Sequence, residues 1–155
     1  MERALFTDSI SIQKEDFSIA ELSDQVRAND ASNGAIVTFT GVVRQLEGDV
    51  ELDAMYLEYY PGMTEKALIK IACEARERWL LGNIVIVHRV GRLALNENIV
   101  FVGVGSAHRT EGFQAAQFIM DFLKRDAPFW KKEITVEGEH WVEAKKTDLD
   151  AADSW

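Results

Sequence analysis

The feature that most constrains the fold is a set of long apolar segments rich in β-branched residues. Residues Gly34–Arg44 have the sequence GAIVTFTGVVR, and Asn83–Gly105 is rich in Val and Ile. Runs of this kind are typical of strands that are covered on both faces. The turn at Asn96–Asn98 divides the second run into expected strands at Asn83–Gly91 and Ile99–Gly105. The sequence therefore predicts a buried sheet at the centre of the fold.

Helical segments of the right length are available to cover this sheet. Thr64 is the expected N-cap of a helix that extends to about Trp79, and Glu111–Arg125 is strongly amphipathic and precedes Pro128. A shorter helix is expected after the capping-box pattern that begins at Ser18. Strands and helices alternate irregularly, so the pattern predicts an α+β fold rather than a doubly wound one.

The remaining segments complete one expected domain, residues 1–155, because no linker and no internal repeat divides the 155 residues. Leu52–Tyr60 is expected to pair with the preceding strand through a turn at Glu47–Asp49. The other expected strands are Leu5–Ile12, Trp130–Val136 and His140–Ala144. An acidic tail, about residues 147–155, follows them.

Charge and cysteine content exclude several classes of function. The chain has 17 Lys and Arg against 26 Asp and Glu, for a net charge of -9, which argues against a nucleic-acid coat. One cysteine, Cys73, cannot form an internal disulfide or a Cys-based zinc site, and we expect it to pack in the core. Three scattered histidines add no metal-ligand spacing, so no metal site is expected. Neither a signal peptide nor a membrane span is expected, so the predicted location is the cytoplasm.

A local basic segment interrupts this acidic chain. Residues 105–132 contain five basic and three acidic side chains, which suggests a confined anionic ligand. Small residues in this segment lead to His108 and Arg109, where a helix is expected to begin. Backbone N–H groups at a helix start, beside an Arg fork, can hold phosphate or carboxylate. The alternative is a helix-capping His and an ordinary surface Arg.

Lysines further along the same segment are candidates for proton chemistry. Lys124 lies at the border between the polar and apolar faces of its helix, where desolvation would lower its pKa. Snorkelling of the side chain is the simpler alternative. In the following strand, Lys131 and Glu133 are expected on one face and Lys132 on the other.

Four further residues have a position that can be interpreted. Phe129 and Trp130 either form the flat wall of a heterocycle pocket or cap the core. Arg44 ends a strand that contains Gly41, where a ligand could approach the backbone. His88 lies among Val and Ile, and we interpret it as a histidine of the core or sheet face.

Several longer strings resemble one known family, the large, catalytic subunits of molybdopterin synthase. The strings are FTGVVR (39–44), EYYPGMTEKAL (58–68), HRVG (88–91), FVGVGSAHR (101–109), QFIMDFLKRDAPFWKKE (117–133) and WVEA (141–144). The resemblance covers nearly all of residues 34–145 and implies an α/β-hammerhead fold with an additional small antiparallel β subdomain. It also implies a homodimer within a heterotetramer, because a small ubiquitin-like sulfur-carrier subunit binds each large subunit.

The activity implied by the resemblance is sulfur transfer. The carrier's thiocarboxylated Gly-Gly C-terminus delivers sulfur to cyclic pyranopterin monophosphate, and two deliveries form the dithiolene of molybdopterin in molybdenum cofactor biosynthesis. The resemblance assigns catalysis to Lys124 and Lys131, and it assigns substrate binding to Arg44, His108, Arg109, Lys132 and Glu133. No metal or redox cofactor is implied. Lys145 stands where the family more often has Arg, so it is left outside the expected site.

Two other classes of function compete with this interpretation. One is a non-catalytic module that binds a phosphorylated heterocycle or a peptide tail, although such a module has no need of both lysines. The other is a phosphotransferase, for which the sequence lacks a Walker loop.

Overall fold

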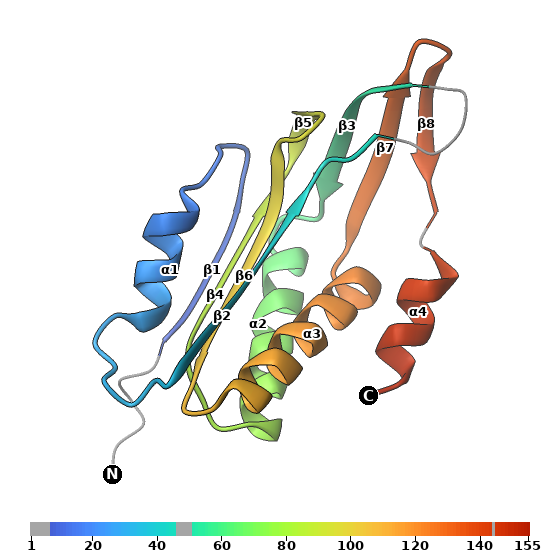
Figure 1. Ribbon diagram of the computed structural model, residues 1–155. Coiled ribbons are helices and arrows are strands. Elements are labelled where there is room, and N and C mark those ends of the chain that lie inside the picture. The colour runs from blue at the N-terminus through green and yellow to red at the C-terminus, as the bar shows by residue number, and fades with distance from the viewer. Residues whose placement is uncertain (1–6, 46–50, 144) are drawn as a thin grey trace.

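The computed structural model describes residues 7–45, 51–143 and 145–155, which form two four-stranded sheets and four helices (Figure 1). The first sheet has the order β1-β4-β6-β2. Its strands are β1 (Asp8–Gln13), β4 (Leu81–Arg89), β6 (Asn98–Ser106) and β2 (Ala35–Val42). β1 runs parallel to β4, and the other pairs are antiparallel. No helix within the described ranges has the length and apolar character needed to cross a membrane.

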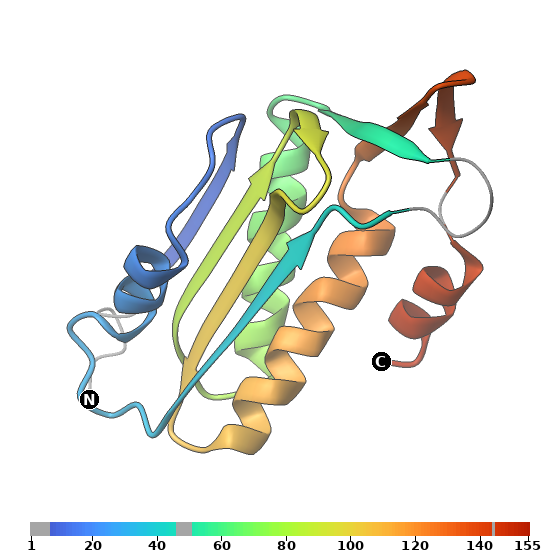
Figure 2. The ribbon, with the colours of Figure 1, turned by 45° about the horizontal axis from the view of Figure 1, so that its top comes forward.

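This first sheet is covered on both faces, as its apolar sequence requires. All nine residues of β4 are buried. Ile84 and Ile86 pack with helices α2 (Met63–Arg78) and α3 (Arg109–Asp126), which lie side by side over one face (Figure 2). The other face packs against α1 (Ile19–Arg27). The expected buried central sheet is confirmed.

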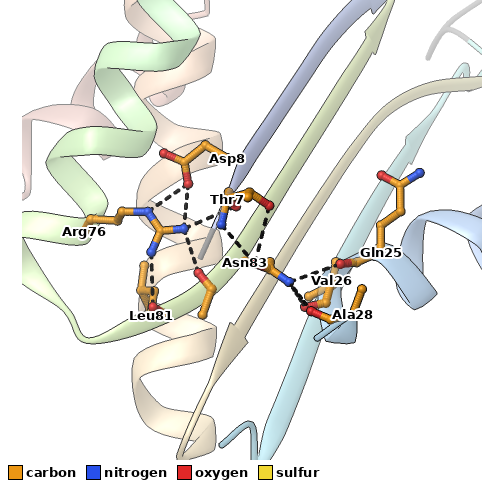
Figure 3. Close-up of polar contacts among 9 residues, drawn as sticks. Thr7, Asp8, Gln25, Val26, Ala28, Arg76, Leu81 and Asn83 are labelled. Atoms are coloured by element: carbon orange, nitrogen blue, oxygen red, sulfur yellow. Dashed lines mark hydrogen bonds and ion pairs between the residues drawn. The ribbon is translucent and has the colours of Figure 1, made fainter. Parts of the chain in front are cut away.

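Polar side chains fasten the helices to the start of β4 (Figure 3). The Arg76 guanidinium of α2 donates to the backbone carbonyls of Leu81 and Gly82 and pairs with Asp8 at 2.6 Å. The buried Asn83 amide donates to backbone carbonyls at the end of α1, including that of Ala28 at 2.9 Å. Carbonyl groups at a helix end lack partners within the helix, so Asn83 supplies one.

The second sheet is antiparallel throughout and has the order β5-β3-β7-β8. Its strands are β5 (Gly91–Ala94), β3 (Leu52–Tyr59), β7 (Phe129–Thr135) and β8 (Gly138–Val142). The apolar cluster on its inner face includes Leu52, Met55, Leu57 and Leu93. The α+β class and the small antiparallel sheet are confirmed.

The chain closes with α4 (Lys146–Asp153), which packs against α3. Trp155 anchors this helix, because its ring lies edge-on to Trp79 at 5.7 Å and to Phe118 at 5.6 Å. Its indole N–H donates to the Asp121 carboxylate at 2.6 Å. The sequence predicted only an acidic tail here, and the helix was missed.

Several details differ from the sequence-based expectations. β2 pairs with β6, not with β3, because β3 has exposed charged residues at Asp53 and Glu58 and suits a sheet with one covered face. The expected turn at 47–49 lies outside the described residues, as do residues 5 and 6 of the first expected strand. β5 was not expected. The single cysteine, Cys73, is exposed rather than packed.

The start of α2 also differs from its expected form. Gly62 is the N-cap, at a φ of 87° that favours glycine, and its N–H donates to the Glu65 carboxylate. Thr64 is buried instead: its hydroxyl donates to the Pro128 carbonyl at 2.9 Å and accepts from the Tyr60 N–H. This contact ties the start of α2 to the loop between α3 and β7.

Candidate active site

A cavity of about 640 Å³ lies where the two sheets, α3 and α4 meet. β3, β4 and β7 contribute to its wall, together with the C-terminal ends of β2, α3 and β8 and the start of α4. Its apolar lining is formed by Val42, Leu52, Met55, Leu57, Ile99, Leu123, Ala127, Phe129 and Val142. This size and composition are typical of a site for a small molecule.

Four basic side chains reach this cavity from four different segments. Arg44 follows β2, Lys124 lies in the last turn of α3, Lys131 belongs to β7, and Lys145 is the N-cap of α4. The acidic side chains that line it are Glu133, Glu143 and Asp148. Cations held beside an apolar wall can bind an anionic heterocycle and offset negative charge that develops in a reaction.

The more buried of the two expected catalytic lysines is Lys131. Burial lowers the pKa of Lys131, and the positive charge of Lys124 lowers it further, whereas Glu133 opposes the shift. Lys131 therefore loses its proton more readily than an ordinary lysine, as a group that moves protons near neutral pH requires. Lys124 lines the same cavity but is exposed. The expectation that Lys124 is the half-buried one is wrong, because its side chain leaves the helix toward the open cavity.

Glu133 lines the cavity, but Lys132 does not belong to this group of residues. Lys132 pairs with Glu139 at 3.1 Å and lies over the rings of Trp141 and Tyr56 at 5.1 and 5.2 Å. Successive side chains of a strand point to opposite faces, so Lys131 and Lys132 cannot share a site on one face. The structure therefore corrects the expectation that Lys132 belongs to the substrate-binding residues: it lies outside the cavity, on the other face of β7.

His108 and Arg109 lie at the opposite end of α3 from Lys124. Arg109 is the first residue of the helix and His108 is its N-cap, and both are exposed. Arg109 and Lys124 are fifteen positions apart, which corresponds to about 22 Å of helix. Neither residue lines the cavity, so a single chain does not bring them together with the lysines.

The structure adds two residues to the site that the sequence analysis left out. Lys145 was set aside because of its departure from the family pattern, yet it lines the cavity. His88 was interpreted as a histidine of the core or sheet face. It is buried, with 5% of its surface exposed, and it also forms part of the cavity wall. The sequence signal that could have identified His88 is its position near the end of β4, on the same strand face as Ile84 and Ile86.

The ring of His88 is held in one orientation. It stacks on Phe129 with the ring centres 3.9 Å apart, and its Nδ1 lies 2.8 Å from the Arg89 backbone carbonyl. Burial, together with the charge of Lys124, lowers the pKa of His88 to about 4, although this hydrogen bond opposes the shift. The imidazole is therefore neutral at physiological pH.

A family model described as MoaE protein matches residues 12–126 of the chain. The chain belongs to the MoaE family. The molybdopterin synthase catalytic subunit of Escherichia coli K12 is 51% identical over 146 residues, which cover 94% of this chain and 97% of that protein. The corresponding subunit of Pseudomonas aeruginosa is 49% identical and covers 95% of this chain and 98% of its own length.

Solved structures of the family have the same fold. The molybdopterin biosynthesis MoaE protein from Burkholderia ambifaria gives a TM-score of 0.82 at 47% identity, over 96% of this chain and 97% of that one. Molybdopterin synthase from Staphylococcus aureus gives 0.78 at 31% identity, over 90% and 97%. Membership of the MoaE family makes the chain an enzyme of molybdopterin biosynthesis, in which molybdopterin synthase catalytic subunits act.

Proposed function

We propose that the chain is a sulfurtransferase, which moves sulfur from the thiocarboxylated C-terminus of a small carrier protein to cyclic pyranopterin monophosphate. The observation that carries the proposal is the convergence of Arg44, Lys124, Lys131 and Lys145 on one cavity with an apolar wall. Such a cavity suits a substrate that combines a flat heterocycle with a phosphate. Its electrostatics also suit a step in which a carboxylate is released.

The chemistry assigns separate roles to these side chains. Arg44 has the planar fork that suits phosphate, whereas Lys145 contributes a point charge to the same cavity. Lys124 and Lys131 offset charge when the thiocarboxylate sulfur forms a bond to a side-chain carbon of the pterin and the bond from that carbon to its oxygen substituent breaks, with a lysine supplying the proton that the departing oxygen takes up. Water then cleaves the bond between that sulfur and the carrier's acyl carbon, which leaves the carrier with a free carboxylate. Lys131 is the better proton donor and acceptor, because its pKa is lowered by burial.

We further propose that the carrier is a separate subunit with a ubiquitin-like fold, whose Gly-Gly tail enters this cavity. The relatives from E. coli and P. aeruginosa are described as catalytic subunits, a term that implies an additional subunit in those enzymes. An extended tail without side chains fits a narrow approach, and its terminal carboxylate would lie among the cations. Binding should weaken as salt is added, because the attraction is electrostatic.

The large subunits themselves are proposed to form a homodimer, which gives His108 and Arg109 a way to act. Because they lie about 22 Å from Lys124 along α3, they could reach a cavity only in the second copy of the chain. This arrangement can be tested by mixing Arg109→Ala and Lys131→Ala chains. If the site is shared, each mixed dimer contains one intact site and the mixture regains activity at low pterin concentration. If each chain works alone, mixing restores nothing.

The direct test of the proposed function is reconstitution. The chain, a thiocarboxylated carrier and the cyclic pterin are combined, and the dithiolene product is measured by mass spectrometry. A carrier that lacks its last two glycines is the matched control and should yield no product. Binding of both ligands without product would favour a non-catalytic binding module instead.

A further inference from the structure

The wall of the cavity contains one polar atom whose purpose the proposed roles do not explain. His88 is the only histidine among the described residues that line the cavity, and its ring is fixed by Phe129 and by the backbone of Arg89. Its Nε2 has no hydrogen-bond partner within residues 7–45, 51–143 and 145–155. Nε2 is not among the fully enclosed polar atoms that lack a partner, and His88 lines the cavity, so a ligand in the cavity can reach this nitrogen.

The hydrogen bond at Nδ1 determines what Nε2 can do. The Arg89 carbonyl can only accept, so Nδ1 carries the ring hydrogen. A neutral imidazole has one N–H, and Nε2 is therefore an acceptor with a free lone pair. Protonation is disfavoured by burial and by the neighbouring charge of Lys124. The fold thus maintains a neutral acceptor in a cavity whose other polar side chains are mostly charged.

The surroundings of His88 indicate which part of a ligand it would meet. Phe129 stacks on one face of the ring at an angle of 18°, and Leu123 and Leu57 line the same cavity. This part of the wall is apolar and aromatic, and it suits a flat heterocycle rather than a phosphate. An acceptor in such surroundings selects a ligand that presents a hydrogen-bond donor in the plane of its ring.

We propose that His88 orients the substrate by accepting, at Nε2, a hydrogen bond from a ring N–H of the pterin. The inference rests on the proposed function, because it takes the pterin as the occupant of the cavity. His88 is a binding residue in this scheme: it sets which edge of the heterocycle faces the wall. Ring systems that carry an acceptor at that edge are rejected, because two lone pairs would face each other.

Two matched substitutions separate this role from packing. His88→Asn keeps a donor near the Nδ1 position and removes the acceptor at Nε2, whereas His88→Gln places an amide oxygen near the Nε2 position. We expect the Asn variant to raise the KM and the equilibrium Kd for the pterin by about tenfold, with kcat and carrier affinity close to wild type. The Gln variant should recover part of this loss.

His88→Phe retains ring volume and stacking, and it decides the question if the Asn variant does not fold. An unchanged pterin KM and Kd in folded Asn or Phe variants would overturn the inference, as would a loss confined to kcat. Product formation by the wild-type chain tests the proposed function independently. If the wild type forms product and the His88 variants have an unchanged pterin KM and Kd, only the role of His88 is rejected and the proposed function stands.

Discussion

The two sheets of this molecule illustrate two different uses of β structure. In the first sheet, β4 is buried along its whole length, and its two faces pack against helices. In the second sheet, β7 alternates: Lys131 and Glu133 face the cavity, and Lys132 faces outward, where it contacts Trp141. The first sheet contributes a continuous apolar core. The second contributes a wall that holds charge, so we expect stability and chemistry to respond to different substitutions.

The largest expected effect separates the two faces of β7. Lys131→Ala should lower turnover by roughly 10²–10⁴-fold, the scale of a positioned acid–base group, and Lys124→Ala should fall in the same range. Carrier affinity should change much less. Lys132→Ala is the matched control and should stay close to wild type, since that side chain pairs with Glu139 outside the cavity. Single-turnover assays at saturating carrier measure the difference, and equal losses at 131 and 132 would contradict the assignment.

Within the first sheet, the corresponding experiment is Ile86→Ala. Ile86 is fully buried between the sheet and the helices, so its truncation should cost about 2–5 kcal/mol of unfolding free energy. Turnover per folded molecule should change little. Urea unfolding and an assay below the unfolding midpoint give the two quantities. A large loss of turnover in fully folded protein would show that the core and the cavity are coupled.

His88 belongs to both regions, and its buried ring predicts a pH dependence of stability. The pKa of His88 is about 4 in the folded chain, against the ordinary histidine value of 6.5. Above pH 6.5 both states are neutral, so the group has no effect there. As the pH falls from 6.5 towards 4, only the unfolded chain takes up the proton, and stability is lost. At about pH 4.5 the loss should be on the order of 2–3 kcal/mol. Urea unfolding of the wild type and of His88→Phe, measured above pH 6.5 and at about pH 4.5, isolates the loss of stability that His88 causes. The variant should lack this loss.

The smallest expected effect concerns the far end of α3. Arg109→Ala should raise the pterin KM by about tenfold if its fork holds the substrate phosphate from the second chain of a dimer. Unfolding free energy should not change, because Arg109 is exposed. Steady-state kinetics over a range of pterin concentrations provides the test. An unaltered KM would place Arg109 outside the site altogether.

Local signals were sufficient to predict much of the first sheet and its helices. The β-branched run of β4 and the amphipathic pattern of α3 depend on side chains close together in the chain, and both elements form as expected. The capping pattern at Ser18 was also correct, since its side chain accepts from the Glu21 N–H. Positions on one element were equally predictable: strand alternation alone separates Lys131 from Lys132.

What the sequence did not predict depends on distant pairing. β3 joins β7 instead of its neighbour in the chain, and this choice places Leu57 beside Lys131 in the cavity wall. The contribution of His88 requires β4 to end next to Phe129, which lies forty-one residues away. Helix geometry alone predicts that Arg109 and Lys124 lie far apart. The family resemblance nevertheless placed both residues in one site. A family resemblance assigns residues to one site by their role. The fold of a single chain decides which of those residues lie close together within that chain.

The anchor formed by Trp155 has a consequence for optical spectroscopy. Trp79 and Trp155 contact each other within the α3–α4 packing, whereas Trp130 and Trp141 are 47% and 56% exposed on the second sheet. A soluble quencher such as acrylamide should therefore quench the emission of the exposed pair first. Detachment of α4 would expose the other pair and shift its emission to longer wavelength. Because α4 also supplies Lys145 and Asp148 to the cavity, tryptophan fluorescence reports whether that wall is in place.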